Sequence, residues 1–119
     1  MTLSISPGEK VSPVKILSVN IPADADGDSL HVEVVVSEND DMSSPDIDAF
    51  SGDDTTDWYF DDGSGFKPLP PDGIPGGSQP CTVKYKGTSS LAAGKEYNSR
   101  WRVHDGSSYN DPYYKPVRW

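Results

Sequence analysis

The strongest structural signal in this chain is the run Leu-His-Val-Glu-Val-Val-Val-Ser at residues 30–37. Leu30, Val32, Val34 and Val36 occupy every second position of that run. Successive side chains of a β-strand point to opposite faces, so these four lie on one face of an extended segment. The pattern predicts a strand whose apolar face lies in a hydrophobic core.

Alternating apolar runs of the same kind recur on both sides of this segment. They predict further strands at residues 15–21, 47–50, 58–60, 66–69, 81–85, 97–103 and 109–119. The 11 glycines and 11 prolines are spread along the whole chain, which favours many turns and short strands over helices. A chain of 119 residues has the size of one domain. We therefore expect an all-β, antiparallel β-sandwich of about seven strands at residues 13–119, preceded by an extended arm at residues 1–12.

The charge of the chain is acidic and unevenly distributed. The net charge is −9, and 15 of the 19 acidic residues are aspartates, which favour turns and caps. Residues 1–62 contain 15 acids and 2 bases, whereas residues 63–119 contain 4 acids and 8 bases. One interpretation is that solvated Asp-rich loops keep the protein soluble. The other is that the two halves form faces of opposite sign, suited to head-to-tail packing between copies.

Several partners and compartments are disfavoured by the same composition. Nucleic acid is not expected, because an acidic chain repels phosphate and no basic patch is present. Cys81 is the single cysteine, so no internal disulfide can form. The first 20 residues lack a continuous apolar run, which argues against a signal peptide. The longest apolar run, at residues 34–36, is far too short to cross a membrane.

A distinctive spacing of Leu, Gly and Tyr occurs in the segment Leu91-Ala92-Ala93-Gly94-Lys95-Glu96-Tyr97, followed by Arg100, Arg102 and Val103. This segment resembles the passage into strand F of fibronectin type III domains. The resemblance implies that Tyr97 is a corner tyrosine whose hydroxyl bonds to backbone a few residues upstream, with Leu91 as its packing partner and Gly94 in the turn. It implies a single immunoglobulin-like (fibronectin type III-like) sandwich. The chain departs from the family in having no Trp before Trp58, whereas the family's core Trp lies on strand B.

The end of the chain carries a second likeness. It reads Trp101-Arg102-Val103, then Asp105-Gly106, then Tyr109, and closes at Trp119. An aromatic strand, an acidic-Gly turn and a final aromatic residue are similar to the ends of fibronectin-like domains in bacterial and phage surface proteins. The resemblance implies a domain that works on a surface or in a particle.

One short acidic segment is a candidate metal site. Asp24, Asp26 and Asp28 alternate around Gly27, and calcium prefers several hard oxygen ligands of this kind. The segment lacks the Gly and Glu positions of an EF-hand loop. A tight Asp-Gly turn between two strands explains the same residues without a metal, so both readings stand.

Catalytic motifs are not found. His104 followed by Asp105 has the order of a base and its orienting acid, but no serine lies in a Gly-flanked nucleophile elbow. His31, His104 and Cys81 do not have the spacing of a zinc site. Cys81 is expected to be a small core residue. The sequence therefore predicts a protein that is not an enzyme and needs no cofactor, with calcium as the one candidate ion.

Aromatic residues are the strongest candidates for a binding surface. The last predicted strand contains Tyr109, Tyr113, Tyr114 and Trp119, and Tyr59 lies on the opposite face from its aromatic neighbours. Exposed aromatic side chains act as anchors at protein interfaces and as stacking platforms for sugars. Ordinary packing in the core accounts for the cluster equally well.

These features favour a structural or accessory subunit of a larger assembly. A phage or phage-like virion is the expected setting, as a decoration, tail or surface protein, which places the chain in a virion or on an extracellular surface. Its partners would be other proteins or further copies of itself, docked by strand addition or aromatic anchoring. The alternative is an adhesion or carbohydrate-binding module of a bacterial extracellular protein, with a glycan as its ligand.

Overall fold

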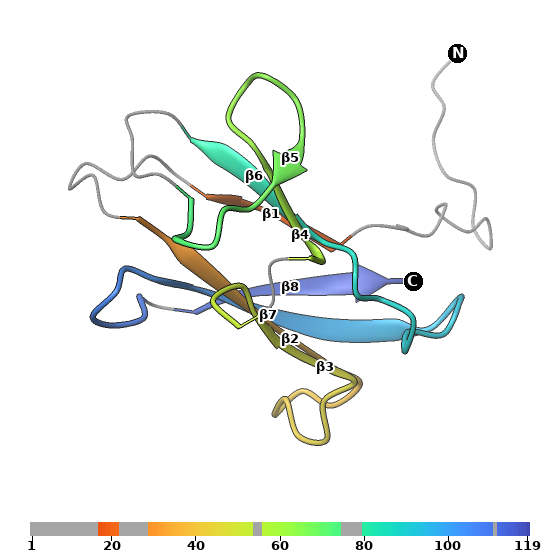
Figure 1. Cartoon of the computed structure of the whole chain (residues 1–119). Coiled ribbons are helices and arrows are strands. Elements are labelled where there is room, and N and C mark those ends of the chain that lie inside the picture. The colour runs from red at the N-terminus through yellow and green to blue at the C-terminus, as the bar shows by residue number, and fades with distance from the viewer. Residues whose placement is uncertain (1–16, 22–28, 54–55, 75–79, 111) are drawn as a thin grey trace, which may run out of the picture.

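The computed structural model describes residues 17–21, 29–53, 56–74, 80–110 and 112–119, which form eight strands and no helix (Figure 1). The strands are β1 (Leu17–Ile21), β2 (His31–Ser37), β3 (Ile47–Phe50), β4 (Trp58–Asp61), β5 (Lys67–Pro68), β6 (Cys81–Tyr85), β7 (Glu96–His104) and β8 (Tyr113–Arg118). They make two antiparallel sheets of four strands each. Among these residues, no helix has the length and hydrophobicity needed to cross a membrane.

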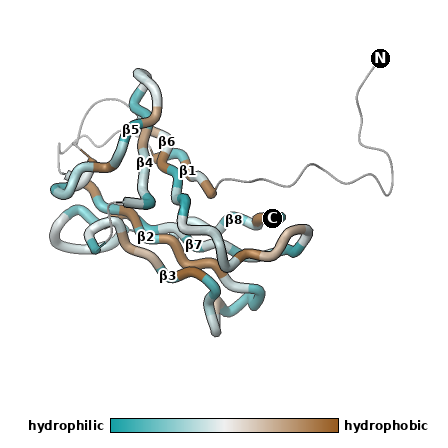
Figure 2. Tube along the Cα trace, turned by 45° about the vertical axis from the view of Figure 1, so that its right-hand side comes forward, coloured by the Kyte–Doolittle hydropathy of each residue, from teal (hydrophilic) through white to brown (hydrophobic). Residues whose placement is uncertain are grey.

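The two sheets form the two layers of a sandwich. The first sheet has the order β1-β6-β4-β5 and the second has the order β3-β2-β7-β8. Figure 1 shows the first sheet above the second, with each strand running beside its hydrogen-bonded neighbours. In Figure 2 the brown, hydrophobic residues concentrate on the strands, whereas most loop tips are teal or white. An all-β sandwich is therefore the architecture of this chain.

The core is built from the inward sets of alternating side chains. On β2 the inward residues Val32, Val34 and Val36 are completely buried. Trp58 on β4 is also completely buried, and its ring lies 6.5 Å from that of Trp101 on β7 in an edge-to-face arrangement. This T-shaped pair joins the two sheets, because β4 and β7 belong to different layers.

The outer face of β2 is more buried than simple alternation predicts. Val35 is 6% exposed, although its side chain points away from the core set. In the sheet register Val35 lies between Asp48 of β3 and Arg100 of β7, and these longer side chains flank it on both sides. A central strand with a neighbour on each side loses solvent contact even on its outer face.

The corner before β7 has the geometry that the resemblance implied. The Ala92 N–H donates a hydrogen bond to the Tyr97 hydroxyl at 2.8 Å. Gly94 has a φ of +81°, a left-handed conformation that disfavours any residue with a Cβ. Leu91 and Tyr97 are both buried in the core. The turn is thus held from inside by one phenolic hydroxyl.

Two sequence predictions concern residues outside the described part of the chain. These are the extended arm at residues 1–12 and the candidate calcium ligands Asp24, Asp26 and Asp28. Among the residues that the structure does describe, no group of three or more His, Cys, Asp or Glu side chains is placed to hold a metal ion.

Candidate functional site

The free edge formed by β8 carries the most exposed aromatic side chains of the described chain. Tyr113 is 56% exposed and Tyr114 is 57% exposed. β8 is the last strand of its sheet, so its other side has no hydrogen-bonded neighbour among the described strands. In the register with β7, Tyr113 lies opposite Trp101 and Tyr114 lies opposite Arg100, which places the two tyrosines on different faces of the sheet.

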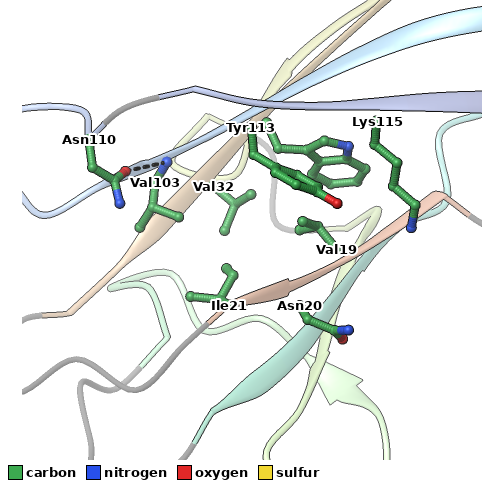
Figure 3. A pocket seen from close by; sticks show the side chains of 9 residues that line it. Val19, Asn20, Ile21, Val32, Val103, Asn110, Tyr113 and Lys115 are labelled. Atoms are coloured by element: carbon green, nitrogen blue, oxygen red, sulfur yellow. Dashed lines mark hydrogen bonds between the residues drawn. The ribbon is translucent and has the colours of Figure 1, made fainter.

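An apolar cleft opens between β8 and β1, where the two sheets meet at one side of the sandwich. It has a volume of about 250 Å³ and is shown in Figure 3. Its apolar lining comes from Val19, Ile21, Val32, Trp101 and Val103. These residues belong to both sheets, so the cleft leads from the surface into the core. A volume of this size suits one ring or one branched side chain rather than a large ligand.

Polar groups surround the mouth of this cleft. Asn20 on β1, Asn110 before β8, and Lys115 on β8 line it together with Tyr113. The Lys115 ammonium donates to the backbone oxygen of Ser18 at 2.8 Å and so ties β8 to β1. The mouth therefore offers amide, phenol and ammonium groups around an apolar floor.

The outer face of the second sheet carries an ion-pair cluster. Arg102 donates to Glu33 through two nearly parallel bonds, with Nε to Oε1 at 2.7 Å and Nη2 to Oε2 at 2.8 Å. Arg100 Nη2 donates to Glu33 Oε1 at 3.2 Å. The Glu33 side chain is 11% exposed, whereas those of Arg100 and Arg102 are 26% and 27% exposed. One carboxylate thus holds two guanidinium groups across the β2–β7 pair.

The charges of this cluster set the protonation of Glu33. Burial alone would raise its pKa, but the hydrogen bonds and positive charge of Arg102, then those of Arg100, outweigh burial. The pKa of Glu33 is therefore held below the ordinary value of 4.5. Glu33 is ionised at neutral pH and is fully engaged by protein donors, so it serves as a structural carboxylate rather than a general base.

An aromatic group adjoins this ion-pair cluster on the same face. The Arg102 guanidinium lies 3.9 Å from the centre of the Tyr109 ring. The Tyr109 ring lies 4.7 Å from the His104 ring and 6.1 Å from the Phe50 ring. His31 completes the group at 5.6 Å from Phe50. The group links β2, β3 and β7 to the turn that leads into β8.

The predicted interface residues are not all alike in the structure. Tyr109 is 37% exposed and Tyr59 is half-buried beneath the ammonium of Lys86, which lies 4.1 Å from its ring centre. Trp119 was predicted as an interface residue and this prediction is wrong, because it is 8% exposed and belongs to the core. Its backbone N–H donates to Lys95 O at 2.9 Å, which continues the β8 ladder and turns the indole inward. Tyr113 and Tyr114 are the most exposed of the predicted interface residues.

The histidines have structural partners. His31 Nδ1 lies 3.1 Å from Ser51 Oγ, and that hydroxyl also accepts a bond from Val32 N–H at 2.8 Å. Ser51 has no solvent exposure, so no substrate could reach its hydroxyl. His104 Nδ1 accepts a bond from Gly106 N–H at 3.0 Å. His31 therefore joins β2 to the residue after β3, and His104 supports the turn after β7.

Asp105 and Cys81 also have local roles. The Asp105 carboxylate accepts bonds from Ser107 N–H and Ser108 N–H, both at 2.9 Å, and these bonds lower its pKa. The carboxylate closes the turn rather than orienting His104. Cys81 is only partly buried, at the margin of the core.

Two parts of the site were missed by the sequence reading. The cleft depends on the separation of β1 and β8 in space, and no local pattern reports that distance. The Glu33 cluster had a weak signal, since Arg100 and Arg102 alternate on one strand and Glu33 lies on another. Only the register between β2 and β7 shows that these charges meet.

No protein-family model, no curated protein and no solved structure matches this chain.

Proposed function

We propose that this chain is a non-enzymatic structural or accessory subunit that acts through protein–protein contacts at the β8 edge. The observation that carries the proposal is the pair of exposed tyrosines, Tyr113 and Tyr114, on an edge strand whose outer side has no neighbour among the described strands. Aromatic side chains give large contact area at a small cost in conformational entropy, so they are favoured at interface centres. The adjoining cleft would accept one apolar side chain of a partner.

The proposal includes an immunoglobulin-like topology and a place in a phage or phage-like virion. The topology is supported by two four-stranded antiparallel sheets and by the Ala92 to Tyr97 hydrogen bond at the corner. The virion setting is supported by the likeness of the C-terminal segment to surface domains. That support is analogy at the level of fold, since many functions share one sandwich.

Light scattering of the purified full chain tests the contact surface. We expect the mass to exceed that of a monomer and to rise over a roughly tenfold concentration range, since copies that associate obey mass action. The variant Tyr113→Ser with Tyr114→Ser should shift the mass toward the monomer. Phe66→Ser is the matched control, because Phe66 is 45% exposed and directly precedes β5, which belongs to the other sheet.

A carbohydrate-binding role is the second candidate, favoured by the mixed chemistry of the cleft mouth. Asn20, Asn110 and Lys115 supply hydrogen-bonding groups beside the Tyr113 ring, a combination that suits sugar hydroxyls and a sugar face. A glycan array with and without a calcium chelator distinguishes the candidates. If the chain is monomeric and gives a specific glycan signal that Asn110→Ala abolishes, carbohydrate binding replaces assembly as its proposed role.

A further inference from the structure

We propose that copies of this chain join edge to edge, with β8 of one copy pairing with β3 of the next and extending the second sheet. The inference rests on the proposed assembly function and names its partner, a second copy. The contact is heterologous, because two different edges meet. It therefore builds a ring or an open-ended row rather than a two-fold dimer.

Strand directions permit this contact. β3 and β8 are the two outer strands of one sheet, whose order is β3-β2-β7-β8. All three pairs in that sheet are antiparallel, so β3 and β8 run in opposite directions. A copy shifted along the sheet places its β3 beside β8 in an antiparallel orientation. The alternation of strand direction then continues without interruption.

The backbone of β3 has hydrogen-bonding groups available for a new neighbour. Ser51 N–H donates to Val32 O at 2.9 Å, so Ser51 directs its backbone toward β2. Residues of an antiparallel strand alternate between the two sides. Asp48 and Phe50 are an odd number of positions away, so their backbone groups point away from β2. The Phe50 C=O already accepts a bond from Asp53 N–H at 3.0 Å, which leaves the Phe50 N–H and the two backbone groups of Asp48 for a new neighbour.

The backbone of β8 is available in the same way. Trp119 N–H donates to Lys95 O at 2.9 Å, toward the β7 side of the sheet. By the same alternation Tyr114, Pro116 and Arg118 direct their backbone groups away from β7. Pro116 has no N–H, so this edge offers donors at Tyr114 and Arg118 and an acceptor at each of the three residues.

Charge favours the pairing of unlike edges. Residues 38–53, which contain β3, hold six acidic residues and no Lys or Arg. Residues 113–119, which contain β8, hold Lys115 and Arg118 and no acid. The acidic segment at 38–53 and the basic segment at 113–119 thus lie at opposite edges of one sheet. Complementary edges attract each other and steer the encounter.

The same residues disfavour the pairing of like edges. Two β8 strands would bring Lys115 and Arg118 near their counterparts, and two β3 strands would do the same with Asp48. Like charges directly opposite each other destabilise a strand pair. Charge therefore favours the pairing of β8 with β3 over either pairing of like edges.

One register brings complementary side chains together and leaves the Asp48 and Phe50 N–H groups facing β8. The Asp46 backbone takes no part in this ladder, because its N–H donates to Val36 O at 2.8 Å and its C=O accepts from Ser90 Oγ at 3.0 Å. When Tyr114 lies opposite Phe50 of the next copy, Arg118 lies opposite that copy's Asp46, since the strands are antiparallel. Tyr114 and Phe50 both belong to the outer face, because they are in register with Arg100 and Glu33 respectively. The contact would thus combine an aromatic pair with an ion pair, both of which stabilise neighbouring strands.

Charge reversal tests this pairing on the full chain. The variants are Asp46→Lys, Arg118→Glu and the two combined, with Asp72→Lys as a control of equal charge change on an exposed turn. Sedimentation velocity is run up to about 1 mM, which detects association as weak as a millimolar dissociation constant. Circular dichroism and Tm verify that each variant is folded.

We expect wild-type protein to associate, and each single reversal to weaken association about five- to tenfold. The combined variant should restore association, because the ion pair is rebuilt with its signs exchanged. Asp72→Lys should associate like wild type. Added salt should weaken wild-type association, since exposed ion pairs are screened.

Other results would overturn the inference. Wild type that stays monomeric at the highest concentration rules out the edge pairing. The edge pairing is also ruled out if the single charge reversals leave association unchanged. It is ruled out equally if the combined variant does not restore association. If Tyr113→Ser with Tyr114→Ser still abolishes that association, the proposed function stands and only the β3–β8 pairing fails. A monomer with specific glycan binding refutes the proposed function itself.

Discussion

Replacing Glu33 with Gln tests whether the ion-pair cluster holds the centre of the second sheet. The change keeps the shape of the side chain and removes its charge. Gln offers one carbonyl oxygen, so its amide group must face guanidinium N–H groups that are also donors. Of the three bonds that Glu33 accepts from Arg100 and Arg102, the variant can retain one or two.

The size of the effect follows from the geometry. A hydrogen bond to a charged group contributes about 1.5–3 kcal/mol in proteins, and a two-bond Arg–carboxylate pair is among the stronger kinds. Both arginine side chains are about a quarter exposed, so solvent screening reduces the value. We expect Glu33→Gln to lower the free energy of unfolding by about 2 kcal/mol and Tm by about 8 °C.

The pH dependence supplies a sharper test. The pKa of Glu33 in the folded protein lies below the ordinary value of 4.5. Its stabilising contribution is therefore complete above pH 4.5 and is lost as the pH falls through the folded value. The difference in stability between wild type and Glu33→Gln should be largest at neutral pH and should narrow in acid.

Urea unfolding at neutral and acidic pH measures this difference. Glu96→Gln is the matched control, because Glu96 is 79% exposed and 3.9 Å from Arg118, and it should cost less than about 0.5 kcal/mol. A loss from Glu33→Gln as small as that of the control would show that the cluster does not support the sheet. An equal loss at both pH values would show that charge is not the cause.

Two further substitutions and one labelling measurement test other parts of the fold. Tyr97→Phe leaves Ala92 N–H without its acceptor and should cost about 1–2 kcal/mol in urea unfolding, whereas no loss would mean that water replaces the hydroxyl. Gly73→Ala should cost more than about 2 kcal/mol, since φ is +95° and the new Cβ would lie 2.7 Å from Leu30 O; an unchanged Tm would contradict this. Burial raises the pKa of Cys81, so maleimide should label it more slowly than a free thiol at pH 7, and equal rates would refute the assignment.

Strands were predictable because their side chains alternate. The runs at residues 81–85 and 47–50 coincide with β6 and β3. The predicted strand at 66–69 shrinks to Lys67–Pro68, since proline lacks an N–H for the ladder. The last strand begins at Tyr113 rather than at Tyr109, which instead makes a single bridge to His104.

The wrong prediction that Trp119 is an interface residue shows what sequence spacing alone cannot determine. Tyr113, Lys115, Val117 and Trp119 share one parity on the last strand, and Val117 is a core residue. Residues at these alternate positions lie on the inner face of the strand, which agrees with the burial of Trp119. Tyr113 lies on the same face and is nevertheless exposed. The difference arises because Tyr113 lies at the open cleft, whereas Trp119 lies at the closed corner beside Gly94. Position along the sandwich decides exposure, and sequence spacing does not report it.

The ion-pair cluster also attaches the segment before β8 to the centre of the second sheet. Arg102 contacts Glu33 on one side and the Tyr109 ring on the other, so the turn before β8 is attached to the centre of the sheet. The next residue, Asn110, exchanges two bonds with Val103, both at 3.0 Å.

These contacts fix the chain at Asn110, three residues before Tyr113. An edge held in its binding conformation loses little entropy when a partner docks, and this raises affinity without any new contact. A substitution at Glu33 should therefore weaken association at β8, although Glu33 lies two strands away from the edge. Stability and assembly would then depend on one carboxylate.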